Sequence, residues 1–96
     1  IVHFESEWRV YVEDNEIKSI HYYQGDPTIF PNVKRINNML ESFDGPCCYA
    51  LDVGELNGYT SLVEFNDFYS LGNYGLFPED YAQMLIRRWK ELKNVH

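Results

Sequence analysis

Apolar and polar side chains alternate near the start of the chain in the pattern of a β-hairpin. Residues 7–13 (EWRVYVE) have the two-residue period of a strand, and residues 16–23 (EIKSIHYY) form a second β-rich run. Asp14 and Asn15 lie between the two runs and are typical turn residues. The pattern therefore predicts a hairpin over the first quarter of the chain.

A second hairpin is predicted further along the chain. Residues 47–53 (CCYALDV) form a nearly continuous apolar run of strand length, and residues 59–66 form the next strand. Residues 54–58 (GELNG) have glycine at both ends, so we expect them to be the connecting loop.

Two segments have the apolar spacing of amphipathic helices. Residues 33–43 follow Pro31, which can occupy the first turn of a helix, and the Asp-Gly-Pro sequence at 44–46 ends the pattern. The second helix is predicted to begin with the Pro-Glu-Asp sequence at 78–80, where acidic residues favour the helix dipole. Its expected apolar stripe is Tyr81, Leu85, Trp89 and Leu92.

The predicted order of elements is β-β-α-β-β-α. Two hairpins, each followed by a helix, predict an α+β fold in which an antiparallel sheet carries two helices on one face. The 96 residues are one domain by size, residues 1–96. Apolar residues make up 45% of the chain and aromatic residues 17%, which is enough for a packed core and argues against disorder.

The net charge of −7 limits the partners that the chain is expected to have. Nucleic acid and anionic membrane surfaces need basic contacts, so neither is an expected partner. No apolar run is long enough to span a bilayer. Nucleotide binding through a divalent metal ion stays compatible with this charge. Cys47 and Cys48 are adjacent and point to opposite faces of a strand, so we expect two free thiols and a cytoplasmic location.

Oxygen-bearing side chains share one predicted face of the second hairpin. Glu64 and Asn66 are two residues apart on a strand and point the same way, whereas Val63 and Phe65 point to the other side. If the apolar faces of the two strands coincide, Asp52 joins the polar pair. Two carboxylates and a carboxamide are suitable ligands for a hard cation such as Mg²⁺. The alternative is a half-buried strand whose polar face is only solvated.

Arg9 interrupts the apolar pattern of the first strand. It is either a surface residue on an exposed sheet face or a bidentate clamp on a phosphate oxygen, a role in which lysine would be a poor substitute. If Arg9 acts on phosphate rather than on stability, Arg9→Lys is expected to leave the melting temperature almost unchanged.

An ordered set of short motifs resembles a known family. The motifs are Glu7-x-Arg9 with Val10-Tyr11-Val12, Leu51-Asp52-Val53, Leu62-Val63-Glu64-Phe65-Asn66, Ser70-Leu71-Gly72-Asn73-Tyr74-Gly75 and Tyr81-Ala82. Together they resemble the C-terminal half of ATP-grasp proteins, most closely the clade named for one arginine and two lysines. The resemblance spans residues 7–92 and rests mainly on the order of Arg, then Asp, then Glu-x-Asn.

The resemblance implies roles for these residues. Arg9 matches the arginine that contacts the phosphates of ATP, and Asp52, Glu64 and Asn66 match the magnesium ligands. Full members of the family activate a small-molecule or peptide carboxylate as an acyl phosphate and transfer it to an amine or thiol. The chain is accordingly expected to be a catalytic C-terminal subdomain of a carboxylate ligase.

The match is incomplete, which keeps other functions open. No counterpart of the family's nucleotide-binding lysines precedes Arg9, and the chain starts at Ile1 without an initiating Met, so we expect a piece of a longer protein. One alternative is a nucleotide-binding remnant without turnover. The other is a small interaction module without catalysis, which would present tyrosines to a partner protein. The tyrosines considered for that role are Tyr22, Tyr23, Tyr69 and Tyr74.

Overall fold

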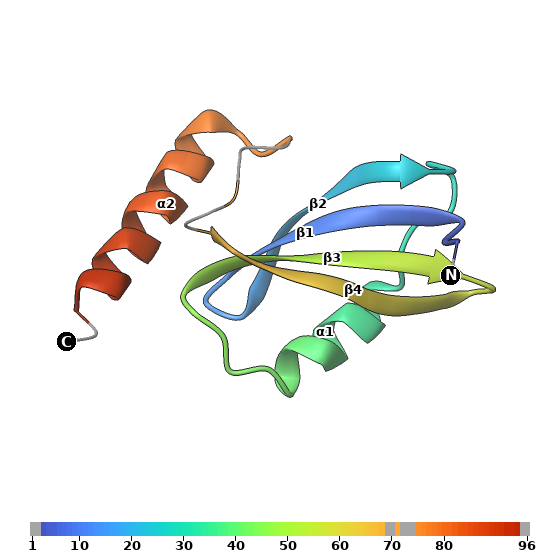
Figure 1. Cartoon of the computed structure of the whole chain (residues 1–96), viewed down its shortest axis with the longest axis horizontal. Helices are drawn as coiled ribbons and strands as arrows, with labels where there is room; N and C mark the ends of the chain where they lie inside the picture. Colours follow the sequence, from blue (N-terminus) through green and yellow to red (C-terminus); the bar gives the residue numbers. More distant parts are fainter. Residues whose placement is uncertain (1–2, 69–70, 72–74, 95–96) are drawn as a thin grey trace.

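The chain folds into four antiparallel strands and two helices in the predicted β-β-α-β-β-α order (Figure 1). The elements are β1 (Ser6–Glu13), β2 (Glu16–Gly25), α1 (Val33–Glu41), β3 (Cys48–Leu56), β4 (Tyr59–Asp67) and α2 (Pro78–Lys93). The structure is a computed structural model that describes residues 3–68, 71 and 75–94. The predicted α+β class and both predicted hairpins are confirmed.

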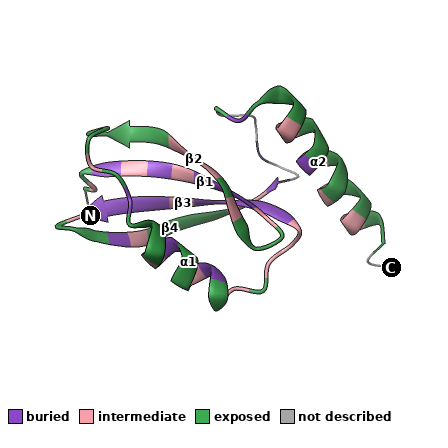
Figure 2. Cartoon of the chain, turned by 180° about the vertical axis from the view of Figure 1, so that it is seen from behind, coloured by how far each residue is buried: buried purple, intermediate pink, exposed green. Residues whose placement is uncertain are grey.

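The sheet has the strand order β2-β1-β3-β4, and every neighbouring pair is antiparallel. The two hairpins therefore meet through β1 and β3, while β2 and β4 form the edges. Figure 2 shows β3 buried along most of its length in the middle of the sheet. A strand that is covered on both faces explains why its sequence is nearly continuously apolar rather than alternating.

Helix α1 packs on one face of the sheet. Ile36 and Leu40 are its buried residues. The strands contribute the remainder of this first core through every second residue, because successive side chains of a strand point to opposite faces of the sheet. The strand residues in this core are Trp8, Val10, Val12, Tyr49, Leu51 and Val53.

Helix α2 packs on the opposite face, so the prediction of two helices on one face is wrong. Met84 of α2 belongs to a second core together with Tyr11 of β1 and Cys48 and Ala50 of β3, whose side chains point away from α1. The apolar run of β3 supplies side chains to both faces, and each face takes one helix. Met84, which is not part of the expected stripe, is the buried residue of α2. Tyr81 and Leu85 of that stripe are partly buried and pack against the same core, whereas Trp89 is 46% exposed.

Ion pairs attach α2 to one end of the sheet, where Figure 1 places the helix. Arg88 contacts Asp67 at the end of β4 at 2.7 Å, and Arg87 contacts Asp14 in the β1–β2 turn at 2.8 Å. Glu91 accepts a hydrogen bond from the backbone N–H of Cys47 at 3.0 Å. The second core and these contacts hold the helix at the end of the sheet that carries the β1–β2 turn, the start of β3 and the end of β4.

Both hairpin turns consist of two residues with positive φ. Asp14 and Asn15 have φ of 51° and 63°, and Asn57 and Gly58 have φ of 54° and 78°. Two such residues in succession form the turn type that matches the twist of a hairpin. The predicted loop at 54–58 is therefore too long, because β3 continues through Gly54 to Leu56 and only Asn57 and Gly58 turn.

Capping explains where the helices begin. The side chain of Asn32 accepts a hydrogen bond from the backbone N–H of Arg35 at 3.1 Å, so α1 starts after Asn32 rather than at Pro31. Helix α2 begins as predicted, with Pro78 in its first turn followed by Glu79 and Asp80.

Candidate functional site

One cross-strand row of polar side chains crosses the face of the sheet that is opposite α1. Arg9 of β1 lies directly opposite Asp52 of β3, and Asp52 lies directly opposite Glu64 of β4. On the other side of Arg9, its partner in β2 is His21. Directly opposed residues of antiparallel strands project from the same face, so these four side chains form a continuous row.

Arg9 and Asp52 form a bidentate ion pair at the centre of this row. The Nε and Nη2 atoms of Arg9 donate to the two carboxylate oxygens of Asp52 at 2.9 and 3.0 Å. Their side chains are only 14% and 13% exposed. The hydrogen-bonded Asp52 raises the pKa of Arg9 above its ordinary value, against the opposing effect of burial. Two opposite charges that are hydrogen-bonded in this way can be held in a partly buried position.

Asn66 completes a cluster with the predicted metal ligands. Its Nδ2 atom donates to Asp52 Oδ2 at 3.1 Å, one pleat along β4 from Glu64. Glu64 is exposed, and no described residue makes a hydrogen bond or ion pair with its carboxylate. Asp52, Glu64 and Asn66 therefore share one face, as the alternation of the sequence predicts, and their role as metal ligands stays a prediction.

A β-bulge determines which side chains of β4 point to each face of the sheet. Asp52 pairs with Glu64 and Val53 pairs with Leu62, which leaves Val63 as the extra residue. Leu62, rather than Val63, consequently shares the α1 face with Phe65.

The chemistry of the cluster fits a hard divalent cation. Two carboxylates and one carboxamide supply oxygen donors of the kind that Mg²⁺ prefers. Within residues 3–68, 71 and 75–94, no group of three His, Cys, Asp or Glu side chains gathers as a metal site. The donor set is therefore limited to these two carboxylates and the amide of Asn66, which would have to turn its oxygen toward the cation.

Aromatic residues that the motifs do not reveal surround the row. The ring of Tyr23 lies 5.3 Å from the guanidinium carbon of Arg9, a cation–π distance. The ring of Phe4 lies against Gly54, where an added Cβ atom would overlap it. A glycine inside a strand often marks the close approach of another group. Gly54 could therefore have indicated that a side chain, here that of Phe4, packs against this position of β3.

The residues of the interaction-module alternative are only partly described. Tyr22 and Tyr23 are 40% and 44% exposed, and the hydroxyl of Tyr22 donates to the carbonyl of Gly25 at 2.5 Å. Tyr69 and Tyr74 lie outside the described residues, as do Ser70, Gly72 and Asn73 of the Ser70–Gly75 motif. Cys47 and Cys48 are free thiols. Neither described helix has the length and apolar character needed to cross a bilayer.

Comparison with known families decides the assignment. A family model for an ATP-grasp domain, family 2 of the clade named for one arginine and two lysines, matches residues 1–84. The chain belongs to this family of ATP-grasp domains. Membership confirms the resemblance seen in the motifs and places the chain in a superfamily of ATP-binding, ligase-type proteins. No curated protein matches the chain.

A solved structure has a similar fold. The C-terminally truncated Cdc123 from Schizosaccharomyces pombe superposes with a TM-score of 0.51 at 17% sequence identity. The match covers all of this chain and 37% of that chain. At this identity the likeness concerns the fold alone.

Proposed function

We propose that the chain is the C-terminal catalytic subdomain of an ATP- and Mg²⁺-dependent carboxylate ligase. The reaction class is formation of an acyl phosphate from a small-molecule or peptide carboxylate, followed by acyl transfer to an amine or thiol. The observation that carries the proposal is the row of Arg9, Asp52 and Glu64, with Asn66 beside it, on one face of an ATP-grasp domain of this clade.

Arg9 is the residue proposed to bind the phosphates. Its guanidinium has five N–H donors in a planar fork. Two of them bond Asp52, and no other described residue accepts from the rest. Arg9 can therefore contact a phosphate oxygen without first leaving Asp52. Asp52 in turn fixes the direction of the fork, and positioning of this kind is the main contribution of a protein to phosphoryl transfer.

Asp52, Glu64 and Asn66 are the residues proposed to hold magnesium. A bound Mg²⁺ ion supplies charge neutralisation for phosphate oxygens. Glu64 is available to it as an exposed carboxylate, whereas Asp52 is already oriented by Arg9 and Asn66. The acidic side chains at this place are then explained by a cation that offsets their mutual repulsion.

We further propose that a longer protein completes the site. The chain spans 37% of the similar solved chain. Its lysines nearest to Arg9, Lys18 and Lys34, lie downstream of it, so the nucleotide-binding lysines of the clade are assigned to another part of the protein. The two free thiols support a reducing compartment, the cytoplasm.

The test compares Glu64→Gln with a matched control in the longest natural polypeptide that contains this chain. ADP release driven by a panel of carboxylates and amines is measured at saturating Mg²⁺. Loss of a metal ligand is expected to lower turnover by roughly a hundredfold or more, since even supporting residues of metal sites cost 10–100-fold. Glu41→Gln removes another exposed carboxylate, at the end of α1 on the other face of the sheet, and should leave turnover unchanged.

Unchanged turnover in Glu64→Gln would reduce Glu64 to a surface residue and overturn the assignment. The melting temperature should change little, because Glu64 is exposed and has no described partner. The 96-residue chain alone should be nearly inactive. Turnover by this chain at the rate of the longer polypeptide would show that no other part completes the site.

A further inference from the structure

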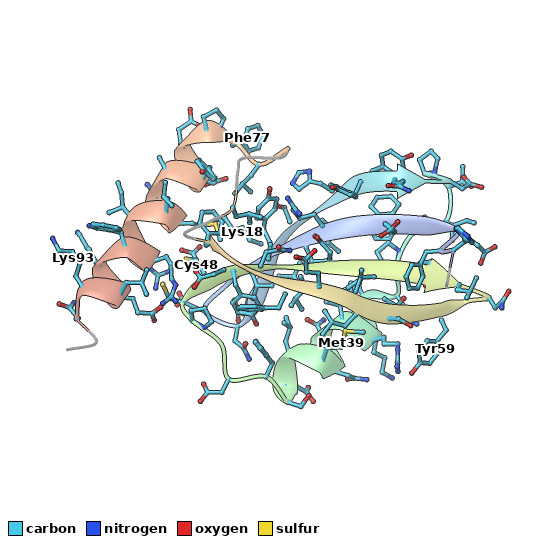
Figure 3. All side chains as sticks on the ribbon, in the orientation of Figure 1. Lys18, Met39, Cys48, Tyr59, Phe77 and Lys93 are labelled. Carbon is cyan, nitrogen blue, oxygen red and sulfur yellow. The ribbon has the colours of Figure 1, made fainter. Side chains whose placement is uncertain are left out.

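A cavity of about 230 Å³ opens between the edge strand β2 and the N-terminal end of α2. Strand β2 contributes Lys18, Ser19 and His21, and the other side is formed by the start of α2 and the residues before it. Figure 3 shows Lys18 in the space between the sheet and α2, with Phe77 at the near end of the helix. The cavity lies on the same sheet face as Arg9, but it contains none of the residues proposed to bind nucleotide or metal.

The walls combine hydrogen-bond acceptors with an apolar surface. Ser19 Oγ and His21 Nε2 are 3.0 Å apart, and burial lowers the pKa of His21 below its ordinary value. Leu76 and Phe77 supply the apolar wall, and Asp80 of α2 supplies a carboxylate. The volume is below the range of about 300–1,000 Å³ that is typical of drug-sized ligands, so the cavity suits a smaller molecule.

The carboxylate of Asp80 has no close hydrogen-bonding partner among the described residues. Lys18 is its nearest cation, and the Lys18 Nζ atom lies 3.8 Å from Asp80 and 3.7 Å from Glu13. Both distances exceed hydrogen-bond length. The position of the Lys18 ammonium thus shows that a positive charge is favourable between Asp80 and Glu13. Lys18 is nevertheless too far from Asp80 to donate a hydrogen bond to its carboxylate.

The surroundings carry an excess of negative charge. A second cavity of about 200 Å³ also has Lys18 in its wall, together with three acidic side chains, Glu13, Asp14 and Glu16. Arg87 is committed to Glu13 and Asp14 through hydrogen bonds of 2.5–3.0 Å. The local field therefore favours a cationic ligand over an anionic one.

We propose that the cavity between β2 and α2 binds a small aliphatic primary amine in its ammonium form. A primary ammonium group presents three donors, as the ammonium of lysine does. Asp80 and Ser19 accept from it, and the alkyl chain lies against Leu76 and Phe77. The site goes beyond the proposed ligase function and does not depend on it.

The test is an amide NMR titration of the chain with n-butylammonium chloride, using sodium butyrate as the control of opposite charge. Shifts are expected at Ser19, His21, Leu76 and Asp80 with the amine, and not with butyrate. Asp80→Asn should weaken amine binding about tenfold, the value of one charge-assisted hydrogen bond. Glu79→Gln removes the neighbouring charge, which does not line the cavity, and should change affinity less than about twofold.

Lys18 gives a second variant whose effect has the opposite sign. Lys18→Gln removes a competing ammonium and should tighten amine binding about two- to fivefold, as expected for an exposed charge. Weaker binding in Lys18→Gln, a preference for butyrate, or an unchanged affinity in Asp80→Asn would each overturn the proposal.

Two controls keep the result interpretable. If the melting temperature shows that Asp80→Asn disturbs α2, Ser19→Ala is used in its place, because it removes a hydrogen-bond acceptor from strand β2. Unchanged amine affinity in Ser19→Ala would overturn the proposal. Mg²⁺ titration of the same variants separates this site from the proposed function. Loss of the amine site should leave Mg²⁺ binding intact, and Glu64→Gln should do the reverse.

Discussion

Replacing Arg9 with lysine keeps the positive charge but removes the planar fork that bonds both oxygens of Asp52. The sequence alone predicts an almost unchanged melting temperature for this variant, on the assumption that Arg9 acts on phosphate only. The ion pair changes that expectation, because its two hydrogen bonds are 2.9 and 3.0 Å long and its side chains are 14% and 13% exposed. Arg9 is therefore expected to contribute to stability as well as to binding.

The size of the effect follows from what lysine can retain. Hydrogen bonds to charged groups contribute about 1.5–3 kcal/mol each, and lysine is expected to keep one of the two, so the loss is about 2 kcal/mol. For a domain of this size, that corresponds to a decrease in melting temperature of about 8–16 °C. Thermal unfolding of the chain, followed by circular dichroism at low and high NaCl concentration, measures it.

Arg87→Lys is the matched control. Arg87 also forms a bidentate contact, with Asp14, but its side chain is 42% exposed. We expect a smaller decrease that high salt removes, whereas the decrease in Arg9→Lys should persist because the Arg9 pair is shielded from counterions. A melting temperature of Arg9→Lys equal to that of the unsubstituted chain, or a decrease that salt abolishes, would refute this reasoning.

Two further predictions concern other polar groups, one buried and one partly buried. Thr60 is fully buried, donates to Glu55 and accepts from the backbone N–H of Asn32 at 2.9 Å. Thr60→Val should lower the free energy of unfolding by about 2 kcal/mol in urea titrations, whereas the exposed Thr28→Val should change it little. The second prediction concerns His21, because burial lowers its pKa in the folded chain below the ordinary value of 6.5. The neutral ring therefore contributes to the stability of the fold above pH 6.5, and this contribution is lost as the pH falls through the lower pKa of the folded chain. The melting temperature should therefore fall less steeply toward acid pH in His21→Asn than in the unsubstituted chain, and His3→Gln, which changes an exposed histidine, should not alter the slope.

The strands could be predicted from the sequence because their signals are local. Alternation identifies β1, and the Asp14-Asn15 pair identifies the first turn. The glycines at 54 and 58 locate the second turn only roughly, because β3 continues to Leu56 and only Asn57 and Gly58 turn. The placement of the helices could not be predicted in the same way. Half-buried sheets are the usual result of paired hairpins, but β3 has apolar side chains on both faces, and α2 covers the second face. The continuous apolar run of β3 was the signal that the one-face prediction overlooked.

The pairing of Arg9 with Asp52 also could not be predicted from the local sequence pattern. A hairpin fixes the register between its own two strands, but β1 and β3 belong to different hairpins, and nothing in either motif specifies their relative register. From the sequence, Glu7 and Glu13 are the nearest acidic neighbours of Arg9 on its strand. The structure instead places a carboxylate from the next hairpin against it, 43 residues away.

The bulge at Val63 allows one short strand to serve both faces of the sheet. Without it, Thr60 and Leu62 would share the face of Glu64 and Asn66, because all four positions are an even number of residues apart. The extra residue reverses the alternation, so Thr60 reaches the buried Glu55 under α1, while Glu64 and Asn66 stay beside Asp52 on the opposite face. The polar row and the packing of α1 therefore depend on the same irregularity in β4. A bulge of this kind re-aims side chains where a regular strand could not, which connects the geometry of the proposed metal site to the fold that supports it.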